Sequence, residues 1–290
     1  MYIYWLAFFS IAAASLERFW PARDQNMIRK WLWSDAVHLI FNGHFFGVVL
    51  YGISFHRVVP YLEGFLRDRG WLDYLYFGAV SDLGIVLQSA IALVVLDLVQ
   101  WSVHKTLHKY SFLWRIHQVH HSVKDGEMDW IVSFRFSWVE PVIYKVAMYV
   151  PAMWFGFAPE ALFFHAVVGT LVGHLNHSNT PWKYGLFKYL INTPHMHLYH
   201  HAYSAPAKGH NFGIIFSCWD WIFGTAHFPD EPCQKIGFPG VELMPNDFFG
   251  QVVWPLPLWI PSIQRTNLFV SVAGIIVLAV LYAASLPPSI

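Results

Sequence analysis

Residues 97–121, DLVQWSVHKTLHKYSFLWRIHQVHH, contain five histidines and begin at the end of a long apolar segment. His104 and His108 are four residues apart, so on a helix both imidazoles leave one face, roughly 5–6 Å apart at Cβ. His117 and His121 repeat this spacing, with His120 beside them. Two such pairs could close on one metal site.

A second HxxHH motif lies about eighty residues further on and consists of His197, His200 and His201. A single histidine in an apolar helix, such as His38 or His165, is usually a core residue with its N–H satisfied. Two copies of HxxHH and one HxxxH near the ends of apolar segments indicate a metal site instead.

The composition is that of a protein whose solvent is largely lipid. Of 290 residues, 56% are hydrophobic and only 12% are charged. Lys+Arg and Asp+Glu balance at 18 each, so no basic surface indicates a nucleic-acid partner. Cys218 and Cys233 lack CxxC spacing, so a bound metal would sit on nitrogen.

We therefore predict an all-α fold: a polytopic membrane helical bundle with a histidine-rich cap. Residues 1–82 are expected to hold N-terminal membrane helices and an interfacial segment, residues 83–265 a histidine-rich domain, and residues 266–290 a last membrane helix. The predicted spans are residues 2–16, 36–59, 83–103, a hairpin of 139–157 and 161–175, and 268–286. Residues 122–136 are the most polar part of the middle, and we expect a loop or short helix on the water side.

Two further features concern the site. Asp97 precedes His104 by two helical turns, so it faces the same side and could accept a hydrogen bond from a ligand imidazole; otherwise it is an interfacial residue near the membrane edge. The second arm of the hairpin brings His174 and His177 to the side of the first cluster. Most Lys and Arg residues lie on that side, which the positive-inside rule places in the cytoplasm.

Taken together, these motifs resemble the sterol desaturase / fatty acid hydroxylase superfamily of membrane di-iron oxygenases. The likeness covers roughly residues 97–225 and rests on D-x6-HKTLH, HQVHH, the HSN at 177–179, P-x2-H-x2-HH at 194–201 and the ending WDWIFGT. It implies that residues 83–265 form a fatty acid hydroxylase-type catalytic domain. The metal ligands it implies are His104, His108, His117, His120, His121, His177, His197, His200 and His201, with His174 as a possible tenth.

The chain departs from the family in one place. The family often has Arg-x-His-Pro-x-Glu after the second motif, whereas Arg135, Ser137, Trp138 and Glu140 occupy those positions here. The missing histidine is not among the implied ligands, so the expected class of activity is unaffected.

The resemblance implies hydroxylation or desaturation of a lipid C–H bond, in a sterol, fatty acyl group, ether lipid or related molecule. Two iron ions and O2 are the implied cofactor and co-substrate; imidazole also accepts zinc, which can occupy such sites after isolation but cannot activate O2. The electron donor is expected to be a separate cytochrome b5- or ferredoxin-like protein with its reductase.

Two other classes of protein also use buried histidines. An intramembrane metal transporter would place its ligands at membrane depth on facing helices, whereas most of these histidines follow helix ends. A b-haem electron carrier could use His38, His44 or His56, but it leaves both HxxHH motifs without a function.

Overall fold

The computed structural model describes residues 1–254, except 27, 54–56, 58, 125–126, 204–208 and 232. These residues form helices and loops, and only two isolated bridges, Ile191 with Phe216 and Ala202 with Ile236, pair the backbone as strands do. This confirms the all-α class. The predicted last membrane helix, 268–286, lies outside the described residues.

The longest helix carries the first two motif histidines. α6 (Ile85–Lys109) starts after Gly84 and runs for 25 residues until Tyr110 turns extended. Within the described residues it is the one helix long and apolar enough to cross a membrane. A span at residues 83–103 was predicted, and α6 fits it; that the chain crosses the membrane several times stays a proposal.

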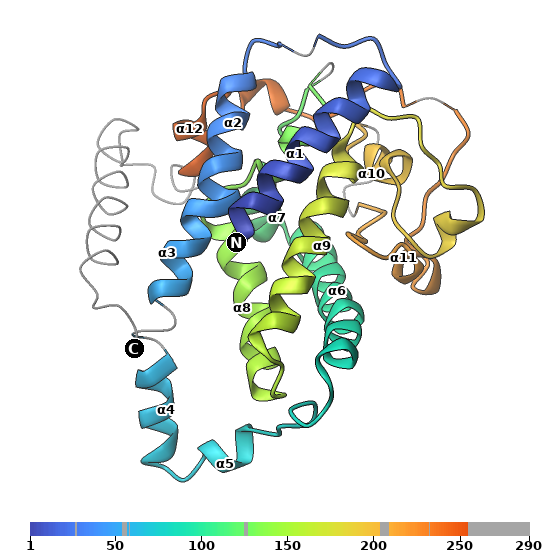
Figure 1. Ribbon diagram of the computed structural model, residues 1–290. Coiled ribbons are helices and arrows are strands. Elements are labelled where there is room, and N and C mark those ends of the chain that lie inside the picture. The colour runs from blue at the N-terminus through green and yellow to red at the C-terminus, as the bar shows by residue number, and fades with distance from the viewer. Residues whose placement is uncertain are drawn as a thin grey trace.

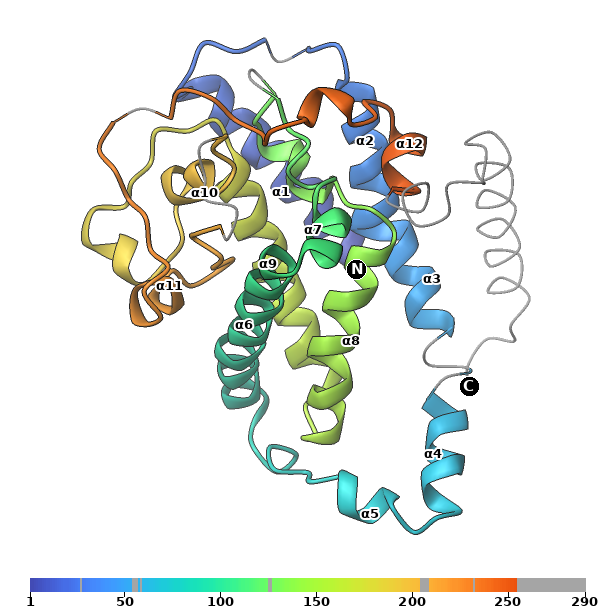
Figure 2. The same cartoon turned by 180° about the vertical axis from the view of Figure 1, so that it is seen from behind.

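α6 packs against the predicted hairpin, whose arms are α8 (Val139–Trp154) and α9 (Pro159–His177). Small side chains at the crossing, Ala92, Ala152 and Ala161, are at most 3% exposed, so the three helices approach closely. The Gln88 side chain accepts the Ala158 N–H at the start of α9 at 2.8 Å. Figures 1 and 2 show α6, α8 and α9 side by side.

The N-terminal helices lie along this core. α1 (Tyr2–Phe19) packs on α9, where Tyr2 and Thr170 share a hydrogen bond of 2.6 Å. The predicted span 36–59 is not one regular helix in the part that is described: α2 (Leu32–Ile40) passes through the π-helical turn η1 (Phe41–Phe45) into α3 (Phe46–Ile53). The segment predicted to be interfacial contains α4 (Val59–Arg67) and α5 (Leu72–Leu75).

Short helices make up the cap. They are α7 (Ser111–His117), η3 (Trp130–Phe134), η4 (Gly185–Tyr189), α10 (Pro194–His200), α11 (Cys218–Ile222), η5 (Val241–Leu243) and α12 (Phe248–Val252). Residues 122–136 form loop and short helix, as predicted, and several of their side chains are buried inside the protein. Val123, Met128 and Val132 are at most 1% exposed, because η3 packs between α2 and α9.

Candidate metal centre

The structure brings nine of the predicted histidines together. α6 contributes two, α7 and the turn after it three, the end of α9 one, and α10 with its C-cap residue three. The nine are His104, His108, His117, His120, His121, His177, His197, His200 and His201, all buried. Segments nearly a hundred residues apart in sequence therefore meet in one interior site.

The nine divide into two groups, and in each group the ligand nitrogens lie within 4.8 Å of one another. The first group contains His104, His108, His117, His121 and His200; the second contains His120, His177, His197 and His201. Each HxxHH motif is split between the groups: the first and last histidines, four residues apart, share a group, and the middle one belongs to the other group. The groups adjoin at His121 and His201, whose rings stack with their centroids 4.4 Å apart. The arrangement is that of two neighbouring metal sites.

Backbone carbonyls fix the protonation of the first group. His104 donates Nδ1–H to the Phe212 carbonyl at 2.8 Å, and His200 donates Nδ1–H to the His210 carbonyl at 2.7 Å. A carbonyl only accepts, so Nε2 of each neutral ring is a lone pair directed into the cluster. Nε2 of His104 faces Nε2 of His117 at 3.1 Å.

His117 is held in the same way by a carboxylate. Its Nδ1 lies 2.7 Å from the Oε1 of Glu140, which fixes the proton on Nδ1 and leaves Nε2 free. Two lone pairs at 3.1 Å repel each other unless a cation lies between or beside them. The first group therefore fits a bound metal ion.

The second group shows the same pattern. His177 donates Nδ1–H to the Gly173 carbonyl at 2.8 Å, and its Nε2 lies 2.9 Å from Nε2 of His197 and 3.2 Å from Nε2 of His120. Buried polar atoms are normally paired. Among the described residues, the cluster nitrogens without a hydrogen-bond partner are His108 Nε2, His120 Nδ1, His197 Nδ1, His200 Nε2 and His201 Nδ1.

The histidines of the cap are neutral at ordinary pH. Burial lowers their pKa well below the usual value for histidine, and neighbouring histidines lower it further; the six are His117, His120, His121, His197, His200 and His201. Metal binding requires neutral imidazole, so these rings need lose no proton to become ligands.

Local structure explains how the second HxxHH motif is presented. Thr193 caps α10 by accepting the Met196 N–H at 3.1 Å, and Pro194 takes the first helical position, which needs no N–H donor. The Asn192 side chain donates to the Gly213 carbonyl at 2.5 Å. This ties the start of α10 to the loop that holds His104.

Asp97 contacts that same loop and so acts on the histidine cluster indirectly. Its carboxylate accepts the N–H groups of Ile215 (2.9 Å) and Phe216 (3.0 Å) and the indole N–H of Trp219 (2.9 Å). The predicted hydrogen bond from a histidine ring to Asp97 is therefore not found. Seven residues of helix rise about 10.5 Å, which is beyond the reach of an aspartate side chain. Asp97 instead holds the loop whose Phe212 carbonyl orients His104.

We expect Asp97→Asn to lower metal occupancy or turnover by about 10–100-fold, the usual loss for a group that supports a ligand. An asparagine offers one acceptor oxygen, and its NH2 would face an N–H donor. Metal per chain and turnover measure the effect, with Asp82→Asn, at an exposed position just before α6, as the control. Equal metal content in the two variants would contradict the prediction.

The sequence predicted no role at the site for two carboxylates, Glu140 and Asp220. Glu140 contacts His117 as described above. Asp220 accepts from Trp101 Nε1 (3.0 Å), Phe212 N (2.9 Å) and Gly213 N (2.8 Å), so α11 and α6 fix the carbonyl that orients His104. Both are 0% exposed. A carboxylate within an apolar or aromatic run is the signal that could have identified them.

His174 lies outside both groups. Its Nδ1 is 2.7 Å from the hydroxyl of Ser133 and its Nε2 is 3.3 Å from that of Ser10. The structure thus places this tentative tenth ligand between α9, η3 and α1, with both nitrogens engaged.

Fold and site together define a helical protein with two adjoining, buried groups of histidines that could each hold a metal ion. Residues 89–225 match the fatty acid hydroxylase family, and this region holds all nine histidines as well as Asp97, Glu140 and Asp220. The resemblance predicted from the motifs is thus confirmed over these residues, which make up just under half of the chain.

Several characterised proteins are similar to the chain. Ornithine lipid hydroxylase OlsE of Rhizobium tropici is 27% identical over 174 residues, which is 59% of this chain and 51% of that protein. Human alkylglycerol monooxygenase is 24% identical over 166 residues, 56% of this chain and 35% of that protein. A very-long-chain aldehyde decarbonylase of Oryza sativa is 24% identical over 210 residues, 62% of this chain and 33% of that protein. These matches span about half or less of each relative, and no solved structure gives a significant match.

Proposed function

We propose that the chain is an integral, multi-pass membrane enzyme, a di-iron lipid hydroxylase that uses O2 and external electrons, with its histidine cluster on the cytoplasmic side. The observation that carries the proposal is the pair of buried imidazole groups whose lone pairs face one another, within a domain of this family. Such a site requires cations to be stable.

The donor set favours a transition metal, because every ligand nitrogen in the two groups is an imidazole. Two iron ions bound there would supply electrons for O2 activation, which zinc in the same sites would not. The protein's own part is to fix the rings: Glu140 orients His117, and the Phe212 and His210 carbonyls orient His104 and His200. Burial of the cluster excludes bulk water.

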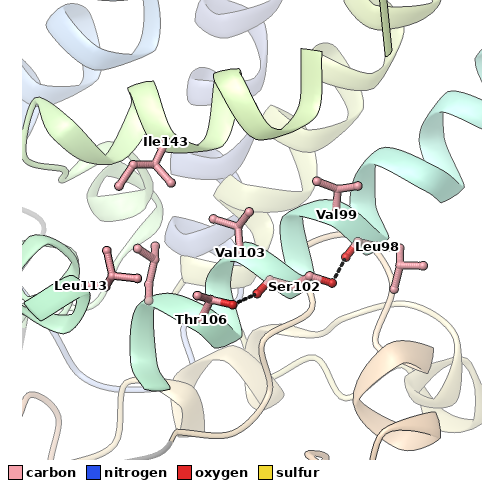
Figure 3. A pocket seen from close by; sticks show the side chains of 8 residues that line it. Leu98, Val99, Ser102, Val103, Thr106, Leu113 and Ile143 are labelled. Atoms are coloured by element: carbon pink, nitrogen blue, oxygen red, sulfur yellow. Dashed lines mark hydrogen bonds between the residues drawn. The ribbon is translucent and has the colours of Figure 1, made fainter. Parts of the chain in front are cut away.

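A groove beside the centre suits a lipid chain. It has a volume of about 430 Å³ and lies between α6, α7 and α8, with Val99, Val103, Leu113 and Ile143 in its lining (Figure 3). Ser102 and Thr106 also line it, but their hydroxyls donate to helix carbonyls, so the lining is mainly apolar. The lining includes Leu107, which directly precedes His108 in α6, and none of the nine histidines. An acyl or alkyl chain could therefore lie along the helices that carry the histidines.

Hydroxylation is favoured over desaturation by the relatives, whose names describe an ornithine lipid hydroxylase and an alkylglycerol monooxygenase. The same centre could desaturate if a second hydrogen were removed in place of oxygen transfer. The electrons would come from a separate cytochrome b5- or ferredoxin-like protein and its reductase, as the family resemblance implies.

The two rival functions explain the geometry less well. A transporter needs ligands along a path, whereas these nine rings close into one compact, buried site. A b-haem carrier needs a histidine nitrogen that is free to bind the iron. Both ring nitrogens of His38 already have hydrogen-bond partners: Nε2 lies 2.9 Å from Gln251 Oε1 and Nδ1 lies 3.1 Å from Asn42 Nδ2. His56 lies outside the described residues.

The experiment is to supply the full chain, in lipid nanodiscs with a ferredoxin or cytochrome b5 reducing system, with labelled oxygen gas and total membrane lipid. We expect two iron atoms per chain and a lipid product that carries one labelled oxygen atom by mass spectrometry. A His200→Ala variant is the control for background oxidation. Full iron loading with no labelled lipid in any lipid class, or activity with one metal per chain, would contradict the proposal.

A further inference from the structure

An exposed apolar surface on the cap takes no part in the metal centre. It consists of Leu186, Phe187, Tyr189 and Leu190 around η4, and Trp221, Ile222 and Phe223 around α11; we call these seven residues the cap patch. Leu186 is 83% exposed and Phe187 and Ile222 are each 67% exposed. Contiguous apolar surface of this kind marks a contact with another protein or with a membrane.

The two halves of the cap patch are one rigid surface. The rings of Tyr189 and Trp221 lie 4.8 Å apart, and the Trp221 indole donates to the Lys188 carbonyl at 3.1 Å. The Ser217 N–H donates to the Leu190 carbonyl at 3.0 Å. The patch therefore exists in the folded chain without a partner to assemble it.

The cap patch is tied to a known depth along α6. Phe223 stacks on Trp101 with ring centroids 4.7 Å apart, and Figures 1 and 2 both show α11 beside α6. From Ile85 to Lys105 the helix rises about 30 Å, the thickness of the hydrocarbon core. Trp101 lies four residues, about 6 Å, before Lys105. If α6 spans the bilayer, the cap patch lies at the boundary between acyl chains and headgroups.

The residue types are those of a membrane interface. Trp and Tyr are enriched at headgroup level, and lysines there extend their charge toward water or anionic lipid. Lys105 lies with its Nζ 4.8 Å from the Trp101 ring, and Lys188 lies 5.3 Å from the Tyr189 ring, so two cations border the aromatic surface. Lys183 contributes less, because Asp230 is 3.7 Å from its Nζ.

We propose that the cap patch is a membrane-docking surface, inserted among the lipid headgroups beside α6 with Lys105 and Lys188 directed at anionic lipid. The inference rests on the proposed membrane function. Docking would hold α11 against the bilayer, and Asp220 of α11 bonds the N–H groups of Phe212 and Gly213 beside the ligand His104. The patch thus sets the height of the metal centre above the acyl chains.

The test places a fluorescent nitrobenzoxadiazole label on single cysteines at Leu186, Ile222 and, as control, Leu243. Leu243 is 84% exposed on η5, so all three sites tolerate a label. The full chain carries Cys218→Ser and Cys233→Ser so that only the new thiol reacts. In nanodiscs we expect headgroup-nitroxide lipids to quench labels at 186 and 222 several-fold more than the label at 243, and iodide in water to do the reverse. Iodide quenching equal at all three sites would overturn the proposal.

A second arm tests the charges. Raising the anionic lipid fraction should increase lipid quenching at 222, and Lys188→Gln should reduce this response. Protection of residues 186 and 222 that required an added electron-donor protein would identify a protein-docking surface and overturn the membrane proposal. Label depth is measured without turnover, so failure of lipid oxygenation would contradict the proposed activity while leaving this result intact.

Discussion

Replacement of His200 or His120 by alanine is expected to abolish lipid oxygenation, with a loss well beyond the roughly 100-fold typical of residues that only support a ligand. His200 belongs to the first group and His120 to the second, so each substitution removes one ligand from one metal site. Backbone carbonyls still hold the protons of His104 and His177 on Nδ1. The site nevertheless loses one metal-binding nitrogen, which no other described side chain replaces.

Metal content and stability give readouts that do not depend on activity. A metal that binds only the folded state raises its stability, so adding ferrous iron should raise the Tm of the wild-type chain, and less so that of His200→Ala or His120→Ala. Without metal, the Tm of each variant should differ less from that of wild type than it does with metal, because the stabilisation by bound metal is then absent from all three. Far lower stability of both metal-free variants would show a structural role instead.

His44→Ala is the matched control, since His44 lies on η1 and belongs to neither group. We expect it to keep its metal and most of its activity, and His38→Ala likewise to keep its metal. His174, His195 and His210 lie near motifs but outside both groups, and partial losses are expected for them. Loss of metal from His44→Ala equal to that from His120→Ala would mean that the site includes the early helices.

That these histidines would lie together could be predicted in part because helical spacing is local. Residues at i, i+3 and i+4 share one side of a helix whatever the rest of the chain does. The division of each HxxHH motif between two groups could not be predicted, because it depends on how α7 and α10 face each other. The role of Asp97 shows the same limit: its side of α6 follows from the sequence, but its partners, Ile215 and Phe216, lie almost 120 residues away.

The burial of residues 122–136 could not be predicted for a related reason. Asp129 and Arg135 find partners about 100 residues earlier, in Arg29 and Asp35. Paired charges can be buried where unpaired charges cannot. No local pattern shows which charges will be paired, so the sequence does not reveal that this polar segment lies in the interior.

The second large effect is expected from a substitution in this buried ion network, which should lower the stability of the fold. Arg135 binds Asp35 through two hydrogen bonds, Nε to Oδ1 at 2.6 Å and Nη2 to Oδ2 at 2.7 Å, and Arg29 binds the same carboxylate at 2.7 Å. Arg135 and Asp35 are 3% and 0% exposed. Arg135 also donates to the Ser122 carbonyl at 3.1 Å, directly after the ligand His121. The network joins α2 to the loop that follows the first HxxHH motif.

We expect Arg135→Ala to lower the free energy of unfolding by about 3–5 kcal/mol, because it leaves Asp35 buried with only one of its two cations. Arg135→Lys should recover only part of the loss, since an ammonium cannot make the paired contact that a guanidinium makes. Denaturant unfolding of the metal-free chain in detergent measures both variants. Arg115→Ala removes an exposed arginine of α7 and should change stability by less than about 0.5 kcal/mol.

The pH dependence of the wild-type chain gives an independent check on the same network. Burial alone would raise the pKa of Asp35, but the Arg135 and Arg29 guanidiniums hold it below its usual value. A carboxyl with a depressed pKa in the folded state stabilises fully above its unfolded pKa of about 3.9 and loses that contribution as pH falls through the folded value. Asp35→Asn should therefore remove a component of acid unfolding below about pH 4. If Arg135→Ala and Arg115→Ala unfolded at the same denaturant concentration, the network would contribute little to stability and the loop after His121 would be held by apolar packing alone.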